Sequence, residues 1–250
     1  MPMTPLISAL VVGVVFLTST ISGIFGMAGG MLLLAGLLTI LPVATAIALQ
    51  GAIQIVANGS RAWFSRSFID WRIIATMVGG LALAALLLFL LRYQPDLATV
   101  CIAVGLMPIL VWLPKSWLQL DASRPVHGFF CGFASGGLNL AVGVAGPSID
   151  IFFIRTQMDR RKVIATKACM QVISHGAKVV FYGATAAAMA AGDWILVAIA
   201  APFAIAGTHM GYGILQRLSD DGFRRWTRWI VTMLGVFYLV RGILLLAGSW

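Results

Sequence analysis

Charged residues are scarce in this sequence. Lysine, arginine and aspartate together make up 10% of the 250 residues, and glutamate does not occur. A soluble domain usually carries about 25% charged residues, so this composition excludes an ordinary water-exposed surface. Hydrophobic residues account for 60% of the chain, and the mean hydropathy is +0.98. Most of the protein surface is therefore expected to face lipid.

Cysteine and histidine are also rare, with three of each. The cysteines are isolated in apolar segments and form no C-x-x-C pair, so neither a disulfide framework nor a metal site is indicated. We expect no cofactor. Residues 1–5 contain no lysine or arginine, which is unlike the basic start of a cleaved leader, and we expect the first apolar run to remain in the mature protein.

Long apolar runs are the main feature that is present. A segment of about 18 or more apolar residues is long enough to cross a bilayer core. Runs close to or above this length occur at 6–23, 73–91, 97–113, 194–215 and 230–247. The sequence therefore predicts an all-α polytopic membrane protein.

The two halves of the chain are related to each other. A shift of 117 positions, the difference between 26 and 143, places Gly26-Met-Ala-Gly29 on Gly143-Val-Ala-Gly146. Without a gap, the same shift pairs Gln54 with Gln171, Gly59 with Gly176, and Arg61 with Lys178. We interpret residues 1–120 and 121–250 as two transmembrane repeats within one integrated membrane domain.

Basic residues indicate how the chain is oriented. They cluster at 61–72, 115–124, 155–162 and 217–228, and 1–5, 41–43 and 187–193 contain none. Since cytoplasmic loops of membrane proteins are enriched in lysine and arginine, we place the four clusters in the cytoplasm and both termini outside. The first repeat then enters the membrane from outside and the second from inside, which is an inverted-topology repeat.

Each repeat is predicted to contain a glycine-broken hairpin followed by three crossings. The segments 29–41 and 147–156 are too short to span comfortably, so we interpret them as re-entrant half-helices. The predicted path is 6–24 with 29–41, then 43–62, 71–91 and 97–114, followed by 126–140 with 147–156, then 162–186, 193–216 and 228–248.

The glycine breaks are candidate binding elements. Irregular backbone at membrane depth is tolerated where it is buried in protein or lines a wet cavity. A half-helix that begins near such a break directs free N–H groups and a positive dipole end toward the cavity, which favours an anion. Close helix packing by small residues is the structural alternative. The candidate residues are Gly29, Gly30, Gly146 and Pro147.

A polar stripe follows each break. Gln50, Gln54, Asn58 and Arg61 share one helical face, as do Lys167, Gln171, Ser174, His175 and Lys178. Amides can hydrogen-bond an oxyanion, and a lysine or arginine supplies counter-charge. The alternative is that these side chains bond neighbouring helices. Our candidate substrate ligands are Gln54, Asn58, Arg61, Gln171, His175 and Lys178.

Two residues are candidates for proton coupling. His175 lies in the second stripe, and a histidine titrates near neutral pH. Asp150, four residues after Gly146, is the one aspartate expected inside a hairpin. It could instead pair with a nearby basic residue such as Arg155.

This arrangement resembles the sulfite exporter TauE/SafE family, also called the toluene sulfonate uptake permease family. The resemblance consists of a glycine-rich break from Gly23 to Gly30, a polar helix from Gln50 to Arg61, and Asp70-Trp71 at the next helix start. The same order recurs from Gly136 to Trp194. The resemblance implies transport of sulfur-containing anions across a bacterial inner membrane.

We therefore expect a secondary transporter for a small anion, working by alternating access, and not an enzyme. A divalent metal-cation permease is the alternative within transport, although it would want more carboxylate, histidine or cysteine ligands. An intramembrane enzyme built on Ser148, Asp150 and His175 is the alternative from another class. Expected partners are the anionic substrate and membrane lipids without nucleic acid, and a homodimer is left open.

Overall fold

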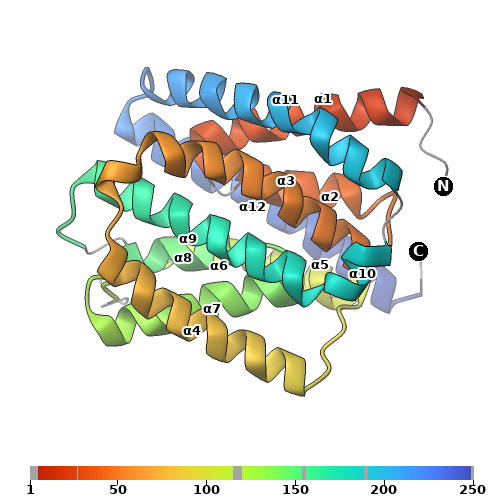
Figure 1. Cartoon of the computed structure of the whole chain (residues 1–250), viewed down its shortest axis with the longest axis horizontal. Coiled ribbons are helices and arrows are strands. Elements are labelled where there is room, and N and C mark those ends of the chain that lie inside the picture. The colour runs from red at the N-terminus through yellow and green to blue at the C-terminus, as the bar shows by residue number, and fades with distance from the viewer. Residues whose placement is uncertain (1–4, 27, 115–119, 154–155, 189–190, 249–250) are drawn as a thin grey trace.

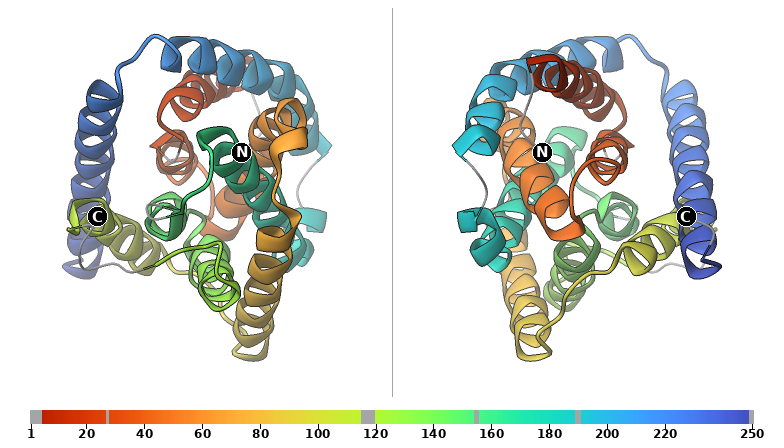
Figure 2. Two further views of the ribbon diagram at one scale, coloured as in Figure 1. Left: turned by 90° about the vertical axis from the view of Figure 1, so that its left-hand side faces the viewer. Right: turned by 90° about the vertical axis from the view of Figure 1, so that its right-hand side faces the viewer.

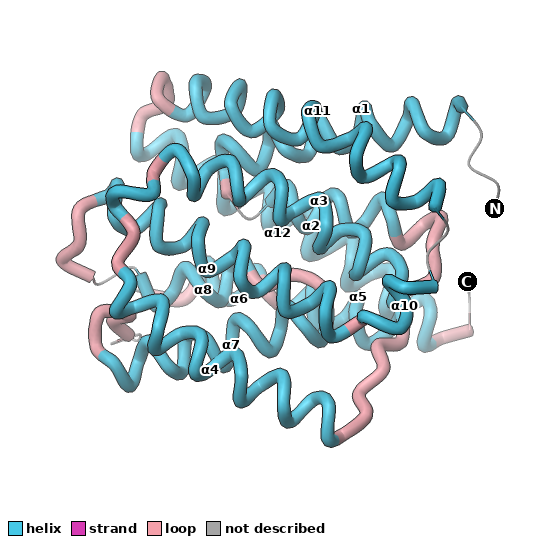
Figure 3. Tube along the Cα trace, in the orientation of Figure 1, coloured by secondary structure: helices cyan, strands magenta, loops and turns pink. Residues whose placement is uncertain are grey.

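A computed structural model shows how the chain folds. It describes residues 5–26, 28–114, 120–153, 156–188 and 191–248, which form helices and connecting turns without a strand (Figures 1 and 3). The α-helices are α1 (Pro5–Phe25), α2 (Ala28–Leu37), α3 (Val43–Phe64), α4 (Trp71–Leu90), α5 (Leu97–Leu106), α6 (Pro108–Trp112), α7 (Pro125–Val142), α8 (Gly146–Phe153), α9 (Arg160–Phe181), α10 (Gly183–Ala188), α11 (Ala191–Leu215) and α12 (Asp220–Leu246), with a 3-10 helix η1 (Arg66–Phe68) before α4.

The prediction of an all-α polytopic membrane protein is confirmed. Four helices or helix portions are long and apolar enough to cross a bilayer, namely Val43–Phe64, Trp71–Leu90, Trp194–Leu215 and Arg225–Leu246. Shorter apolar helices cover Ala9–Phe25, Ala28–Leu37 and Leu97–Trp112. Helix α9 is not among the four, because its polar stripe lowers its hydropathy. It packs against other helices.

The connections that carry basic residues gather at one end of the bundle. The α3–α4 connection, the start of α9 and the α11–α12 connection lie together at the left of Figure 1, and we call this the basic end. The start of α1, the end of α12 and the α4–α5 connection lie at the opposite end. Helix α1 thus runs toward the basic end, whereas α7 runs away from it.

The helices pack in pairs that join the two halves of the sequence. Helix α1 packs along α11, α4 along α7, α5 along α12, and α3 along α9. The short helices α2 and α8 lie toward the middle of the bundle, where most of their residues are buried (Figure 2). Each break-containing hairpin is therefore covered by an outer helix from the other half of the chain.

Glycines allow the closest of these contacts. A Cβ atom added to Gly132 of α7 would overlap the backbone of Met77 in α4, and one added to Gly80 of α4 would overlap Phe129. At the α1–α11 contact, a Cβ on Gly23 would lie 2.5 Å from the Thr208 carbonyl oxygen. Backbones that approach this closely leave no room for a side chain.

Both hairpins reverse direction at a glycine with left-handed backbone. Gly26 has a φ angle of 72° and Gly143 one of 86°, a region that other residues avoid. The helices that follow are short, with 10 residues in α2 and 8 in α8, as predicted for half-helices. Gly26 and Gly143 are also partners under the 117-residue shift.

Several helix boundaries differ from the predicted path. The crossing predicted at 97–114 is interrupted at Met107, because Pro108 has no N–H group to continue the helix. The crossing predicted at 162–186 ends at Phe181, and α10 follows it. Helix α12 begins eight residues before the predicted residue 228. Its early residues remain helical at the basic end.

The predicted helix start at Asp70 is present. The Asp70 carboxylate accepts hydrogen bonds from the N–H groups of Arg72 and Ile73, at 3.1 and 3.3 Å. At the corresponding position in the second half, α11 begins at Ala191, two residues before Asp193. The side chain of Asp193 lies outside the described part of the chain.

Candidate functional site

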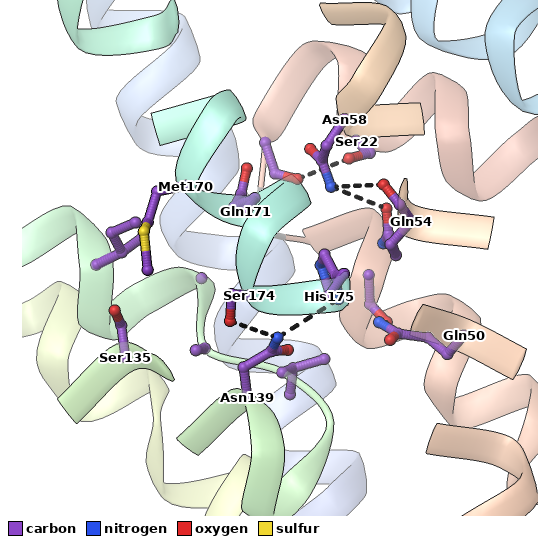
Figure 4. A pocket seen from close by; sticks show the side chains of 16 residues that line it. Ser22, Gln50, Gln54, Asn58, Ser135, Asn139, Met170, Gln171, Ser174 and His175 are labelled. Carbon is purple, nitrogen blue, oxygen red and sulfur yellow. Dashed lines mark hydrogen bonds between the residues drawn. The ribbon is translucent and has the colours of Figure 1, made fainter. Parts of the chain in front are cut away.

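A polar cavity lies between the two halves of the protein, which we call the central cavity. It has a volume of about 40 Å³, and a single water molecule needs roughly 10–15 Å³. Figure 4 shows polar side chains that converge on it from α3, α7 and α9. Its lining consists of Ser22, Gly26, Gly30, Gln50, Gln54, Asn58, Ser135, Asn139, Val144, Ala145, Gly146, Ile149, Met170, Gln171, Ser174 and His175.

Residues related by the internal repeat face this cavity together. The 117-residue shift pairs Gln54 with Gln171, Asn58 with His175, and Ser22 with Asn139. All six line the cavity. The structure thus brings together four of the side chains predicted from the stripes, namely Gln54, Asn58, Gln171 and His175, with residues of both glycine breaks.

Helix α3 supplies the amide wall from the first half. The Asn58 side chain donates a hydrogen bond to the Gln54 carbonyl oxygen at 3.0 Å, which holds it along the helix. Gln50, one turn before Gln54, donates to the Gly30 carbonyl oxygen at 3.3 Å. A Cβ on Gly30 would lie only 2.6 Å from the Gln54 side-chain nitrogen. Gly30 therefore lets the amide approach the start of α2.

Helices α7 and α9 supply the opposite wall. Asn139 of α7 donates to the Ser174 hydroxyl at 2.8 Å, and its side-chain nitrogen lies 3.5 Å from His175 Nδ1 (Figure 4). Both Asn139 and His175 are buried. These contacts hold the side chains of Asn139, Ser174 and His175, which can donate and accept hydrogen bonds, at the wall of the cavity.

Lys178 lies behind this wall and does not line the cavity. It is fully buried. Its ammonium group donates to the Gln50 side-chain oxygen, to the Gly143 carbonyl oxygen at 2.8 Å and to Asn139 Oδ1 at 3.4 Å. In this conformation, Lys178 therefore connects α9 to α3, α7 and the second break.

A second cavity continues from the central one toward the basic end, and we call it the vestibule. Its volume is about 230 Å³. It shares Ser22, Gly26, Gly146 and Gln171 with the central cavity, and its remaining lining includes charged side chains. The charged residues are Arg61, Asp150 and Lys167. The predicted ligand Arg61 is thus placed in the vestibule and not beside Gln54.

Asp150 forms an ion pair with Lys167 of α9 across the vestibule wall. This is the basic partner in the structure, and the alternative partner considered above, Arg155, lies outside the described residues. Among the described residues, no group of three or more histidine, cysteine, aspartate or glutamate side chains is arranged to hold a metal ion. The Ser148 hydroxyl donates a hydrogen bond to the Ala145 carbonyl oxygen at 2.7 Å, and Ser148 lines neither cavity.

The sequence profile of the sulfite exporter TauE/SafE family matches residues 11–238, which is most of the chain. The chain belongs to the sulfite exporter TauE/SafE family. This is a family of membrane transporters, so the protein is a multi-pass membrane protein of a transporter family. No individual curated protein matches the chain. No solved structure matches it either.

In this TauE/SafE protein, two of the candidate residues from the glycine breaks pack against other parts of the protein and do not face the central cavity. Gly29 does not line the central cavity, and a Cβ atom there would overlap the backbone of Thr18 in α1. Pro147 is buried in the first turn of α8, where its missing N–H costs no helical hydrogen bond. Close packing accounts for the positions of both residues, whereas Gly30 and Gly146 reach the cavity.

Other lining residues were not selected from the sequence. Ser22, Ser135 and Asn139 lie on α1 and α7, whose apolar runs conceal single polar positions. A signal for two of them was available, because the repeat shift that pairs Gln54 with Gln171 also pairs Ser22 with Asn139. A search for polar residues at matching positions of both breaks would have found this pair.

Proposed function

We propose that this TauE/SafE protein transports a small sulfur-containing oxyanion or organosulfonate across the bacterial inner membrane by alternating access. The observation that carries the proposal is the chemistry of the central cavity. Its polar lining consists of amides, hydroxyls, one imidazole and the backbone of the two breaks, and no carboxylate of the described residues is part of it. Such groups can donate several hydrogen bonds to an oxyanion.

The start of α8 supports an anionic substrate. Ala145 and Gly146 line the central cavity where this helix begins, and Gly30 lines it near the start of α2. The positive end of the helix dipole lies at a helix start. At α8 the dipole is the main contribution, because Pro147 has no N–H group and the Ser148 N–H donates to the Ala145 carbonyl oxygen. A cation at this position would face these positive ends without a lining carboxylate to neutralise it.

The small volume of the central cavity supports a small substrate. A space of about 40 Å³ suits an ion of a few heavy atoms, such as sulfite, better than a bulky aromatic sulfonate in this conformation. We therefore place inorganic sulfur oxyanions and short organosulfonates first among the candidate substrates. Toluenesulfonate would require the cavity to widen.

The position of the vestibule supports a binding site that opens toward the cytoplasm. It joins the central cavity to the basic end of the bundle, where the arginine-rich connections gather. With these connections in the cytoplasm, the conformation is open inward and both termini lie outside.

A ligand panel tests the substrate class. We would record thermal unfolding of the purified protein at equal ionic strength with sulfite, sulfate, thiosulfate, taurine, acetate and divalent nickel. A ligand at about 100 times its dissociation constant should stabilise the protein by roughly 2.7 kcal/mol. We expect a sulfur oxyanion to give this shift, and Asn139→Ala or Gln171→Ala to remove it.

Gln94→Ala is the matched control, because Gln94 is an exposed amide at the opposite end of the bundle. Stabilisation by nickel alone would contradict the proposal and favour a metal-cation permease. An anion shift that survives in both cavity variants would place the site elsewhere. Loss of a chemical activity in Ser148→Ala with unchanged anion binding would favour an intramembrane enzyme.

A further inference from the structure

Arg61 has a positive charge and no acidic partner in the described part of the chain. Arg61 is partly buried as a whole residue, and it lines the vestibule. Its Nη2 donates to the Ser22 carbonyl oxygen at 2.9 Å and lies 3.5 Å from the Ser22 hydroxyl. No carboxylate among the described residues lies within ion-pairing distance of it. A guanidinium has five N–H donors, so donors remain for a ligand.

The other charges of the vestibule leave it positive. Lys167 and Asp150 also line it and neutralise each other as an ion pair. With Arg61 added, the three charged side chains that line it among the described residues sum to one positive charge. A cavity of about 230 Å³ has room for an anion that keeps part of its hydration.

The lining of the vestibule also offers neutral hydrogen-bonding groups. Gln171 belongs to both cavities, and Tyr212 contributes a hydroxyl-bearing side chain. The Thr227 hydroxyl donates to the Phe223 carbonyl oxygen at 2.8 Å, so its proton is not free for an anion. Ser22 and Gly26 likewise belong to both cavities. An anion beside Arg61 would therefore need to pass only the shared residues to reach the central cavity.

We propose that the vestibule is a second anion-binding subsite, in which Arg61 supplies the counter-charge and Gln171 delivers the anion to the central cavity. This inference rests on the proposed function and adds a separate site to it. The ligand class is the same small oxyanion that the central cavity binds.

The test is an equilibrium titration of sulfite, kept under nitrogen, into the purified full-length protein. The wild type is expected to show two binding phases. Arg61→Gln keeps a polar side chain but removes the charge, so it should remove one phase or weaken it at least about tenfold. Asn139→Ala should remove the other phase, and Arg61→Lys should retain both.

Arg66→Gln is the matched control, since Arg66 is an exposed arginine one turn beyond Arg61 and does not line the vestibule. A single phase that is lost in Asn139→Ala and identical in Arg61→Gln and Arg66→Gln would overturn the subsite but leave the proposed function standing. Absence of binding for sulfite, sulfate and thiosulfate in the wild type would overturn both. A charge effect of equal size in Arg61→Gln and Arg66→Gln would show general attraction and no subsite.

Discussion

Lys178 donates a hydrogen bond to the side-chain oxygen of Asn139, at 3.4 Å. The residues that correspond to them in the first repeat are Arg61 and Ser22, and Arg61 likewise donates to Ser22, at the backbone carbonyl oxygen. In both halves, the cationic end of the stripe thus contacts the helix before the break. The difference is that Arg61 faces the vestibule, whereas Lys178 is fully buried.

This difference fits the alternating-access transport proposed above. Inverted repeats exchange conformations when such a transporter changes state. We therefore expect the opposite state to bury Arg61 and expose Lys178 to a vestibule at the other end. Lys178 then becomes available to the substrate as the sequence predicts, although it does not line the cavity in the present conformation.

Replacement of Lys178 by methionine should destabilise the protein in its present conformation. The substitution removes the donor shared by the Gln50 side chain, the Gly143 carbonyl and Asn139. A buried acceptor that loses its donor costs about 1–3 kcal/mol. We expect the midpoint of thermal unfolding in detergent to fall clearly for Lys178→Met. Lys162→Met, on the exposed first turn of α9, should change little, and equal melting of the two variants would refute the bridging role of Lys178.

Replacement of glycine by alanine should lower stability where two helices pack closely and should not lower it on an open helix surface. Gly132→Ala places a methyl group against the backbone of Met77 and forces α4 and α7 apart. Overpacking of this kind costs about 1–3 kcal/mol or more, so we expect less folded protein on size-exclusion chromatography and a lower unfolding midpoint.

Gly176→Ala is the control for that substitution, since nothing lies within 4 Å of a Cβ at Gly176. Alanine is favoured over glycine within a helix by roughly 0.5–1 kcal/mol, so this variant should be as stable as the wild type or more so. A similar loss in Gly132→Ala and Gly176→Ala would mean that the α4–α7 contact is looser than it is in the structure.

Asp150→Asn should uncouple transport from a proton gradient if Asp150 carries the coupled proton. Asparagine keeps the size of the side chain but cannot titrate, and it leaves Lys167 permanently without its carboxylate partner. In proteoliposomes, we expect exchange of labelled sulfite for unlabelled sulfite to persist in Asp150→Asn, while accumulation driven by a pH gradient is lost. His175→Gln is the parallel variant for the second candidate. Gradient-driven accumulation that persists in both variants would exclude both residues as proton carriers.

The orientation of the protein is tested by labelling single cysteines in cells. Arg66 and Gln94 are exposed. Arg66 belongs to the α3–α4 connection and Gln94 to the α4–α5 connection, and these connections lie at opposite ends of the bundle. In a background without Cys101, Cys131 and Cys169, an impermeant thiol reagent should label Gln94→Cys in intact cells and Arg66→Cys only after permeabilisation. The reverse pattern would place the basic end and the vestibule outside, and both termini in the cytoplasm.

Much of the fold was predictable from local properties of the sequence. The length of each apolar run predicts a crossing, because a bilayer core accepts only apolar helices of sufficient length. The helix starts at Val43 and Trp71 lie at the predicted residues, since Pro42 and Asp70 are strong local signals. The end of α9 at Phe181 was missed, because no proline marks it. The start of α12 was placed too late, although Ser219 caps it by accepting a hydrogen bond from the Gly222 N–H.

The sequence by itself thus determined the membrane character, the two breaks and the polar face of each stripe, because these depend on composition and helical periodicity. The tertiary structure decided which polar residues share a cavity. Gln54 and Gln171 are 117 positions apart and meet only because α3 packs along α9. It also separated Arg61, in the vestibule, from Lys178, which is buried among acceptors from three elements. That distinction depends on side-chain neighbours far away in the sequence, which no local pattern encodes.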